Sequence, residues 1–313
     1  MVKDNVLLTG ATGFVGNAVL NTLHNRGCFV TAMGRARPKL ADSFVSCNLN
    51  NISDCSAAFK TAEVVVHVAA RAHVMKEVNA DPLTLYREVN STATINLARQ
   101  AAANGIKRFI FVSSVKVNGE STQPGAPFSF EQAPCPQDPY GVSKAEAEAG
   151  LRQIATETGM EVVIIRPPLV YGPGVKANFA AMMRLARKNL PLPLGAIHNK
   201  RSLVALDNLV DLIITCIDHP KAANQTFLVS DDEDVSTTEL LQMMTRAAGK
   251  KPRLLPVPVS WLKLAGKLTG KSAVIDRLCG NLQVDISHTK QTLGWTPPIT
   301  VEEGIARCFA AKG

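Results

Sequence analysis

A buried strand, a glycine-rich turn and a helix follow one another at the start of this chain, and this order constrains the fold most strongly. Residues 5–9 (Asn-Val-Leu-Leu-Thr) form an apolar run typical of a buried strand. Gly10, Gly13 and Gly16 follow, and the next residues have apolar side chains at helical spacing. In parallel α/β sheets, such a turn brings the pyrophosphate of a dinucleotide to the N–H groups at a helix start. The sequence therefore predicts a dinucleotide site at its first turn.

The three glycines have different expected roles. Gly10 allows a tight turn, Gly13 lets a pyrophosphate approach the backbone, and Gly16 lets the helix pack close to the strand. An ordinary turn with coincidental glycines is the alternative, because the spacing G-x-x-G-x-x-G differs from the simple G-x-G-x-x-G fingerprint. The other residues of this turn expected to contact the cofactor are Thr12, Phe14 and Val15.

Strand-like and helical segments alternate along the rest of the chain. Further apolar runs lie at residues 29–33, 64–68, 109–112, 162–165 and 226–229. This rhythm predicts an α/β protein with a Rossmann-type, doubly wound parallel sheet and a smaller mixed α/β lobe. We expect residues 1–172 to form mainly the sheet domain and residues 173–313 mainly the smaller lobe, with a return to the sheet near residues 203–230.

Composition and charge narrow the class of protein. Of the 313 residues, 46% are hydrophobic and 19% are charged, as in an ordinary globular enzyme. The formal charge of +8 suits an anionic ligand such as a dinucleotide or a sugar diphosphate, and no nucleic-acid-binding motif is present. The seven cysteines follow no C-x-x-C pattern, which predicts reduced thiols and a cytoplasmic location. We find no signal sequence and no apolar run of membrane-spanning length, and we expect no bound metal.

A tyrosine and a lysine four residues apart stand near the middle of the chain. Tyr140 and Lys144 would share one face of a helix that begins with Asp138 as N-cap and Pro139 as first residue. A positive charge beside a phenol favours the phenolate, so we expect Lys144 to lower the pKa of Tyr140 from about 10. Such a phenol can exchange a proton with a hydroxyl or carbonyl group. The pair alone occurs by chance in many helices, and it gains weight from the other motifs.

These motifs together resemble the extended short-chain dehydrogenase/reductase family. The resemblance rests on the three glycines, on Ser114 after an apolar strand, and on the pair of Tyr140 and Lys144. It extends over nearly the whole chain and ends with residues 293–297 (Leu-Gly-Trp-Thr-Pro), similar to a C-terminal L-G-W-x-P of the family. The resemblance is nearest to nucleotide-sugar 4-epimerases and 4-keto-reductases. It implies that the larger domain binds NAD(P) and that the smaller lobe holds the substrate.

The resemblance also implies the catalytic residues, which are Ser114, Tyr140 and Lys144. Ser114 would bond the reacting oxygen of the substrate, Tyr140 would exchange the proton, and Lys144 would hold the nicotinamide ribose. Tyr140 and Lys144 are therefore cofactor contacts as well. Dehydratase members carry Asp-Glu after the serine, where this chain has Val115 and Lys116. Loss of water needs an acid and a base, so the sequence argues against a 4,6-dehydratase.

The end of the second strand bears on the choice of cofactor. NAD-specific enzymes usually have a carboxylate there for the ribose, but this chain has Gly34 followed by Arg35. A missing carboxylate and a nearby guanidinium suit a 2′-phosphate, so we favour NADP(H) over NAD(H). A solvated loop charge is the alternative for Arg35. The further cofactor contacts implied by the resemblance are Asn48, Leu49, Ala69, Ala70, Arg71, Asn90 and Pro167.

The substrate side departs from the family pattern. Many relatives have an asparagine at the position of Leu169, and leucine cannot donate that hydrogen bond to a sugar nucleotide. This favours a less polar sugar, such as a 6-deoxy or N-acetyl hexose. The expected substrate contacts are Ser114, Lys116, Asn178, Leu192, Leu194, Arg201 and Arg277.

Three functional hypotheses follow from the sequence. The leading one is a 4-keto-reductase that acts on a nucleotide sugar in surface-polysaccharide precursor synthesis, and the resemblance implies that the sugar is UDP-linked. The alternative is a 4-epimerase of the UDP-glucose or UDP-GlcNAc type, or one for lipid-linked GlcNAc. A non-catalytic dinucleotide-sensing protein is the third, although a sensor has no need of Ser114, Tyr140 and Lys144.

Two features outside the site concern partners. Relatives pair two helices across a dimer, and here these would be residues 84–103 and 139–154, which contain small residues such as Ala98, Ala147 and Ala149. We therefore expect a homodimer. Residues 261–268 are basic and apolar at helical spacing, and we favour their packing on the second lobe. Contact with a membrane surface is the alternative.

Overall fold

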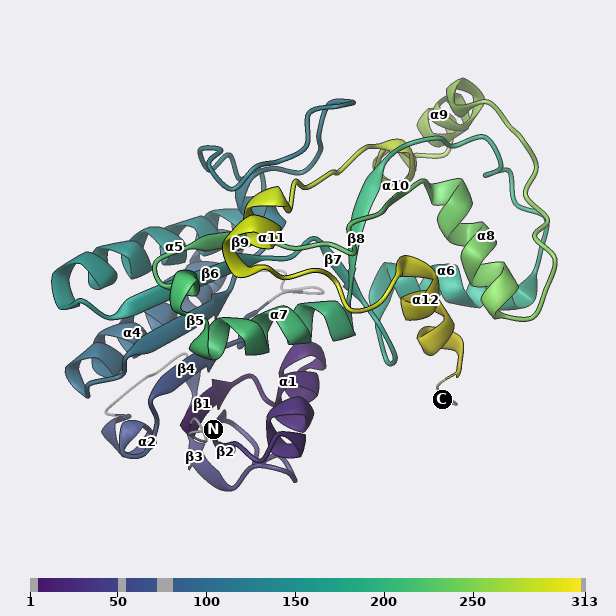
Figure 1. Cartoon of the computed structure of the whole chain (residues 1–313). Coiled ribbons are helices and arrows are strands. Elements are labelled where there is room, and N and C mark those ends of the chain that lie inside the picture. Colours follow the sequence, from purple (N-terminus) through teal and green to yellow (C-terminus); the bar gives the residue numbers. More distant parts are fainter. Residues whose placement is uncertain (1–4, 50–54, 72–80, 311–313) are drawn as a thin grey trace.

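The larger part of the molecule is a seven-stranded parallel sheet with helices on both faces (Figure 1). The computed structural model describes residues 5–49, 55–71 and 81–310. The strand order is β3-β2-β1-β4-β5-β6-β9, and every pairing is parallel. The strands are β1 (Asn5–Thr9), β2 (Phe29–Gly34), β3 (Ser43–Ser46), β4 (Val64–His67), β5 (Arg108–Val112), β6 (Glu161–Arg166) and β9 (Thr226–Leu228). The predicted Rossmann-type α/β fold is confirmed.

Two hydrophobic layers bury the two faces of this sheet. On one face, Val6 and Leu8 of β1 pack with α1 (Phe14–Asn25), α7 (Leu206–Asp218) and α11 (Ser287–Leu293). On the other face, Leu7 packs with α2 (Ser56–Phe59), α4 (Ala93–Ala103) and α5 (Pro139–Thr158). Successive side chains of a strand point to opposite faces, so a strand covered on both sides is apolar throughout. This explains why the central strands read as unbroken apolar runs.

A smaller three-stranded sheet lies beside the large one. Its order is β10-β8-β7, with β7 (Leu169–Tyr171), β8 (Arg201–Ala205) and β10 (Asp234–Val235). The helices α6 (Ala177–Lys188), α8 (Thr237–Ala247) and α12 (Val301–Ala310) pack around it, with Tyr171 and Phe179 stacked in its core. The chain passes between the two parts, because α7 and β9 follow β8 and join the large layer. The domain boundary at residue 172 stays a prediction.

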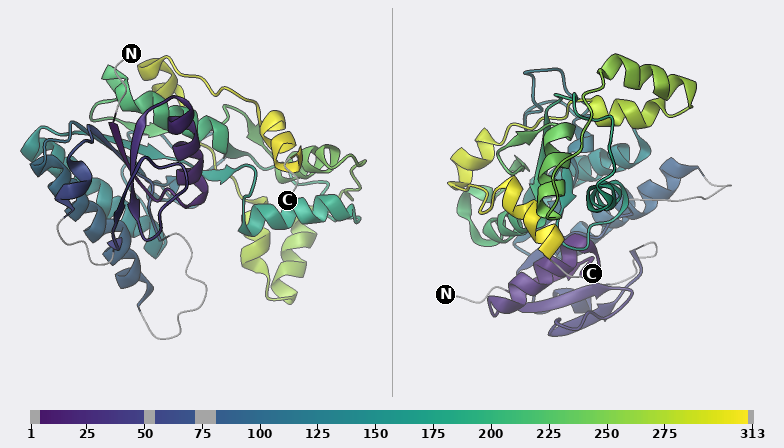
Figure 2. Two further views of the ribbon diagram at one scale, coloured as in Figure 1. Left: turned by 90° about the horizontal axis from the view of Figure 1, so that it is seen from below. Right: turned by 90° about the vertical axis from the view of Figure 1, so that its right-hand side faces the viewer.

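Two short helices project from the far end of the smaller part (Figure 2). They are α9 (Val259–Leu268) and α10 (Ser272–Cys279). Sequence analysis favoured packing of residues 261–268 on the lobe, but only Leu262 and Gly266 of α9 are buried. That expectation is wrong for Trp261, Leu264 and Leu268, which are exposed.

The helix before the central strand is continuous but irregular. Residues 82–103 run through α3 (Pro82–Tyr86), a π-helical segment η2 (Arg87–Thr92) and α4. Two single turns of 3₁₀ helix, η3 (Val115–Val117) and η4 (Pro220–Ala222), complete the structure. The π-helical segment contains buried Asn90, which contributes to the site.

Candidate active site

The glycine turn after β1 leaves no room for side chains. Gly10 has φ +72°, and a Cβ there would lie 2.7 Å from the backbone nitrogen of Ala69. A Cβ on Gly16 would overlap the carbonyl group of Gly10. Gly13 is the N-cap of α1, and no side-chain cap is present at this helix start. The turn therefore offers the backbone N–H groups of α1 to an anion, as a dinucleotide pyrophosphate requires.

The predicted cofactor residues gather at the carboxyl edge of the sheet. Parallel strands end at the same edge, so the residues that follow β1 to β6 lie along one line. Gly34 ends β2 with open space where a Cβ would be, and Arg35 beside it is exposed. The others on this edge are Thr12, Gly13, Phe14 and Val15 after β1, Asn48 and Leu49 after β3, Ala69, Ala70 and Arg71 after β4, and Pro167 after β6. This arrangement and the bare glycine turn fit a dinucleotide.

The side chain of Asn90 forms hydrogen bonds with other groups of the protein. Its Oδ1 accepts a hydrogen bond from the Arg71 backbone N–H at 2.8 Å. Its Nδ2 donates to the Arg71 carbonyl and to Ser143 Oγ, both at 3.1 Å. Asn90 thus ties the loop after β4 to α5, which positions that loop. Its predicted direct contact with the cofactor stays a prediction.

The three predicted catalytic residues converge where β5 ends and α5 begins. Ser114 is half-buried, and its Oγ accepts a hydrogen bond from the Lys116 backbone N–H at 3.2 Å. Tyr140 is half-buried in the first turn of α5. Lys144, one turn later, is buried, and its Nζ donates to the carbonyl oxygen of Val112 at 2.9 Å. A hydroxyl, a phenol and an amine therefore border one region of the sheet edge.

Burial controls the titration of Tyr140 and Lys144. Burial, then the charge of Asp138 and the neighbouring Tyr86, raise the pKa of Tyr140 well above 10. Burial lowers the pKa of Lys144 to about 7, and Glu148 opposes that change. The expectation that Lys144 lowers the pKa of Tyr140 is therefore wrong in this structure. The Lys144 Nζ lies 6.0 Å from the centre of the Tyr140 ring and bonds Val112 instead.

Asp138 fixes the start of the helix that carries Tyr140. Its Oδ1 accepts a hydrogen bond from the Gly141 N–H at 2.6 Å, and Pro139 is the first helical residue, as predicted. Its other oxygen is paired with Lys116, whose Nζ also donates to Glu120 at 2.9 Å. The Lys116 ammonium is thus engaged by two carboxylates, and its predicted contact with substrate stays a prediction.

A buried ion pair behind the catalytic residues was missed by sequence analysis. Glu148 of α5 accepts hydrogen bonds from Arg166 Nε at 2.9 Å and from its terminal nitrogen at 2.6 Å. Ser113 donates to the same carboxylate at 2.6 Å, and Arg166 also donates to Asn118 at 3.0 Å. The carboxylate therefore joins α5 to the ends of β5 and β6. Its signal was Arg166 at the end of an apolar strand, where a solvated charge is unexpected.

His67 is a second missed residue. It ends β4, fully buried, with Nδ1 2.7 Å from Thr9 Oγ1 and Nε2 2.9 Å from Thr94 Oγ1. Burial, with a smaller contribution from Lys144, lowers its pKa to about 3. A neutral imidazole therefore links β1 and α4 beside the glycine turn. A histidine at the end of a buried strand was the only sequence signal.

Five of the predicted substrate residues lie in the smaller part of the molecule, namely Asn178, Leu192, Leu194, Arg201 and Arg277. Arg201 begins β8 and donates to the carbonyl oxygens of Arg277 at 2.9 Å and Gly280 at 3.1 Å. Burial and the neighbouring Arg277 charge lower the pKa of Arg201. Two guanidinium groups near each other suit an anion such as a diphosphate. Asn178 is exposed at the start of α6, and Leu192 and Leu194 are half-buried on a segment that pairs with residues 253–255.

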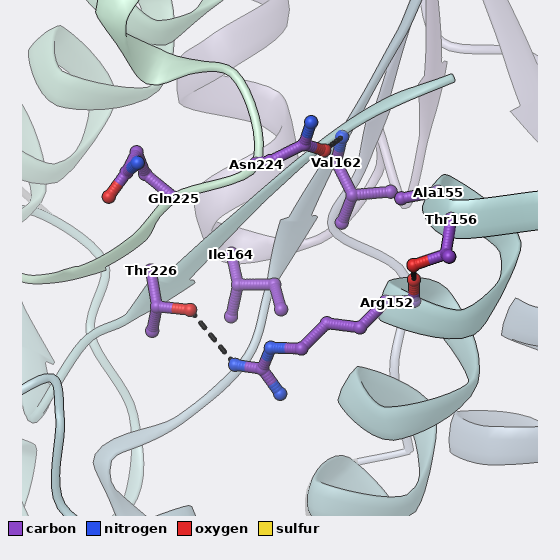
Figure 3. Close-up of a pocket in the computed structure, with 8 residues that line it drawn as sticks. All are labelled: Arg152, Ala155, Thr156, Val162, Ile164, Asn224, Gln225 and Thr226. Atoms are coloured by element: carbon purple, nitrogen blue, oxygen red, sulfur yellow. Dashed lines mark hydrogen bonds between the residues drawn. The ribbon is translucent and has the colours of Figure 1, made fainter. Parts of the chain in front are cut away.

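A cavity lies away from the predicted catalytic residues, and its wall residue Arg152 also donates to Glu148 at 3.2 Å. It has a volume of about 310 Å³ and lies between the second half of α5, β6 and β9 (Figure 3). Arg152 in its wall donates to Thr226 Oγ1 at 2.9 Å. It is 12 residues beyond Tyr140 on α5, or about 18 Å along the helix. We therefore do not assign it to the site.

Two further searches cover only the residues that the structure describes. In this part of the chain, no group of three or more His, Cys, Asp or Glu side chains could hold a metal ion. None of its helices has the length and apolar character needed to cross a membrane.

Comparison with known proteins decides the family. The profile of the NAD dependent epimerase/dehydratase family matches residues 6–230, which is more than half of the chain. The chain belongs to this family. The family implies an enzyme of the extended short-chain dehydrogenase/reductase class that binds a nicotinamide dinucleotide, which agrees with the bare glycine turn.

Individual relatives are similar over nearly their whole length. A UDP-glucose 4-epimerase of Vibrio cholerae is 55% identical over 99% of this chain and 96% of its own. An N-acetyl-alpha-D-glucosaminyl-diphospho-ditrans,octacis-undecaprenol 4-epimerase of Escherichia coli O157:H7 is 27% identical over 98% of this chain and 94% of its own. The crystal structure of a UDP-glucuronic acid 4-epimerase from Bacillus cereus with NAD has a TM-score of 0.77, with 20% identity and coverage of 98% and 97%. This last likeness supports the fold alone.

Proposed function

We propose that this protein is a nucleotide-sugar 4-epimerase. The observation that carries the proposal is 55% identity with the Vibrio cholerae UDP-glucose 4-epimerase over 99% of the chain. Sequence analysis favoured a 4-keto-reductase and kept the epimerase as the alternative. The comparisons favour that alternative, because the relatives named above are 4-epimerases.

The residues at the sheet edge can perform the proton chemistry of such a reaction. A bound nicotinamide dinucleotide supplies the hydride acceptor and donor for carbon 4, and its oxidised ring carries a positive charge. In its phenolate form, Tyr140 would accept the proton of the C4 hydroxyl as that carbon is oxidised, and would return it when the carbon is reduced on its other face. Ser114 bonds the same oxygen. Lys144 would hold the cofactor ribose, and its hydrogen bond to the Val112 carbonyl fixes its position.

The raised pKa of Tyr140 has a consequence for this chemistry. With burial and Asp138 raising that pKa, the phenol is protonated at neutral pH and donates a hydrogen bond to the C4 oxygen. To act as a base, it needs a positive charge nearby. Lys144, when protonated, would supply one such charge, and an oxidised nicotinamide ring would supply another.

We also propose the ligands. Gly34 and Arg35 favour NADP(H), because open space and a guanidinium stand where a carboxylate would repel a 2′-phosphate. Leu169, exposed at the start of β7, favours an N-acetyl or 6-deoxy hexose over a more polar sugar. Arg201 and Arg277 are proposed to bind the diphosphate. The relative from Escherichia coli supports a second substrate class, a lipid-linked sugar diphosphate. A cytoplasmic location stays a prediction. None of the seven cysteines forms a disulfide.

Nuclear magnetic resonance of candidate substrates tests the proposal. Purified protein with cofactor is incubated separately with UDP-glucose, UDP-GlcNAc and a polyprenyl-diphosphate GlcNAc, and the C4 configuration is followed. We expect at least one of them to convert to its C4 epimer, with the N-acetyl sugars favoured. No epimer from any of the three, with intact cofactor binding, would contradict the proposal. Titration of the protein with NADH and NADPH tests the cofactor, and tighter binding of NADH would contradict our choice.

A further inference from the structure

The outer face of α9 is apolar and uncovered. Trp261, Leu264 and Leu268 recur at the spacing of one helix face, and 70%, 59% and 80% of their surfaces are exposed. Large apolar side chains grouped in this way are unusual on the surface of a monomer and mark a contact surface. We call these three residues and Val274 of α10, which is also exposed, the α9 apolar face.

The opposite side of α9 is already used. Among the described elements, α9 packs mainly on α10. The contact is close, because a Cβ on Gly266 would lie 2.8 Å from Ile275 Cγ1. Leu262 and Gly266 are the buried residues of α9. The two helices therefore hold each other, and the α9 apolar face lies on the side of α9 opposite to this contact. The hairpin as a whole projects from the rest of the molecule in both views of Figure 2.

The hairpin that carries the α9 apolar face is positively charged. Residues 259–279 contain four basic side chains (Lys263, Lys267, Lys271 and Arg277) and one acidic side chain, Asp276. The three lysines are exposed. Lysine stems can lie along an apolar surface while the ammonium group stays at a headgroup, and tryptophan is suited to the same interface. Two copies of this face would bring their lysines together, so charge disfavours a contact between copies.

We propose that the α9 apolar face docks on an anionic phospholipid membrane, with its lysines at the headgroups. The hairpin also borders the substrate side of the molecule. A cavity of about 380 Å³ lies between it and Glu120 and Ser121, in the loop that follows Ser114 and η3. Lys263 and Arg277 line this cavity from the hairpin. Docking would therefore place this side of the molecule at the membrane surface. The proposal does not depend on the epimerase activity, because membrane binding is measured without turnover.

Co-sedimentation of the full chain with vesicles tests this proposal. The vesicles are phosphatidylcholine alone, and phosphatidylcholine mixed with phosphatidylglycerol. We expect the wild type to bind the anionic vesicles at least about tenfold more tightly than the neutral ones. The triple variant Trp261→Ser, Leu264→Ser, Leu268→Ser should lose most of this binding, and Lys263→Gln with Lys267→Gln should weaken it. Leu190→Ser is the matched control, because Leu190 is 53% exposed outside the hairpin.

Tryptophan fluorescence gives a second readout, which the wild-type chain itself provides. The chain has two tryptophans, and Trp295 is 6% exposed with its Nε1 donating to Asp211 at 2.9 Å. A blue shift on addition of anionic vesicles therefore reports Trp261, and Trp261→Phe should abolish it. No binding by the wild type, equal binding to both kinds of vesicle, or binding that survives the triple variant would overturn the proposal. A triple variant that changes only the oligomeric state would overturn it as well, in favour of a protein contact.

Discussion

Burial sets the charge of Tyr140 and Lys144 more strongly than their spacing along the helix does. Four-residue spacing brings the two side chains to one face, as predicted. The amine is turned to the Val112 carbonyl, however, and lies over the Phe111 ring at 4.4 Å. Its pKa of about 7 means that it carries only part of a charge at neutral pH. The site therefore depends on a further positive charge to activate the phenol.

Replacement of Tyr140 by phenylalanine separates an enzyme from a sensor. We expect Tyr140→Phe to lower turnover by about 10² to 10⁴, because the proton acceptor is removed. Cofactor affinity should change little, since the ring remains. Turnover by product analysis and cofactor affinity by fluorescence titration are the measurements. Tyr86→Phe, on the neighbouring ring at 5.9 Å, is the control and should keep its activity. An unchanged rate in Tyr140→Phe would exclude the assigned role.

At the scale of elements, one buried carboxylate holds α5 against the sheet. Glu148 accepts hydrogen bonds from Arg166 of β6 and from Ser113 at the end of β5. The first residues of α5 and the end of β5 carry Tyr140 and Ser114, so this contact fixes the elements that position both. Arg166 and Ser113 are buried, whereas the pair that Glu146 of α5 forms with Arg87 of η2 is partly exposed.

The Arg166–Glu148 and Arg87–Glu146 ion pairs should differ strongly in their contribution to stability. Glu148→Gln leaves Arg166 buried beside a neutral group and should lower the free energy of unfolding by about 3 to 5 kcal/mol. Glu146→Gln breaks an exposed pair and should lower the free energy of unfolding much less. Urea unfolding at pH 7 measures both. Equal losses in the two variants would show that the buried network has no special structural role.

His67 makes the sheet sensitive to acid. Its pKa is about 3 when folded and about 6.5 when unfolded, so between these values the unfolded chain binds the extra proton. The stabilisation is therefore complete above pH 6.5 and is lost as the pH falls. We expect a contribution of about 2 kcal/mol to be lost between pH 7 and pH 5. The same unfolding experiment on His67→Asn should show a shallower pH dependence by that amount, and an unchanged slope would contradict this assignment.

For the whole molecule, the parallel sheet was predictable because its strands are buried on both faces. The apolar runs at residues 29–33 and 109–112 match β2 and β5 to within one residue at each end. β3 was not predicted, because it is a half-exposed edge strand of mixed composition. The small strands β7 and β10 have three and two residues, which is too short for a periodic pattern.

The residues of the site likewise fall into those that could be predicted from the sequence and those that could not. The cofactor turn could be predicted because its backbone conformation requires glycines. The catalytic set could be predicted because Tyr140 and Lys144 stand at helical spacing. The positions of Glu148 and His67 could not, because a polar residue in a helix or strand reads the same whether tertiary packing buries it or not. The apolar spacing of α9 had the same ambiguity, since it fits a packed helix and a docking helix equally well.

The predicted homodimer is also a property of the whole molecule. Ala98 and Ala147 are buried against the sheet, so they seat α4 and α5 within the subunit. Ala149 is exposed on the outer side of α5 and remains available to a partner. We expect analytical ultracentrifugation to give a dimer that Ala149→Arg weakens, by placing a bulky charge in the contact. A wild-type monomer at micromolar concentration would contradict this expectation.

The most direct test of the epimerase is the balance between product and cofactor. The protein is given one equivalent of nicotinamide dinucleotide per subunit and an excess of the nucleotide sugar that it converts. Product is counted by nuclear magnetic resonance and reduced cofactor by absorbance. Because an epimerase returns the hydride to carbon 4, we predict many molecules of C4 epimer per cofactor, with no net change in its oxidation state. Product formed one for one with consumed NADPH would contradict the account and identify a 4-keto-reductase.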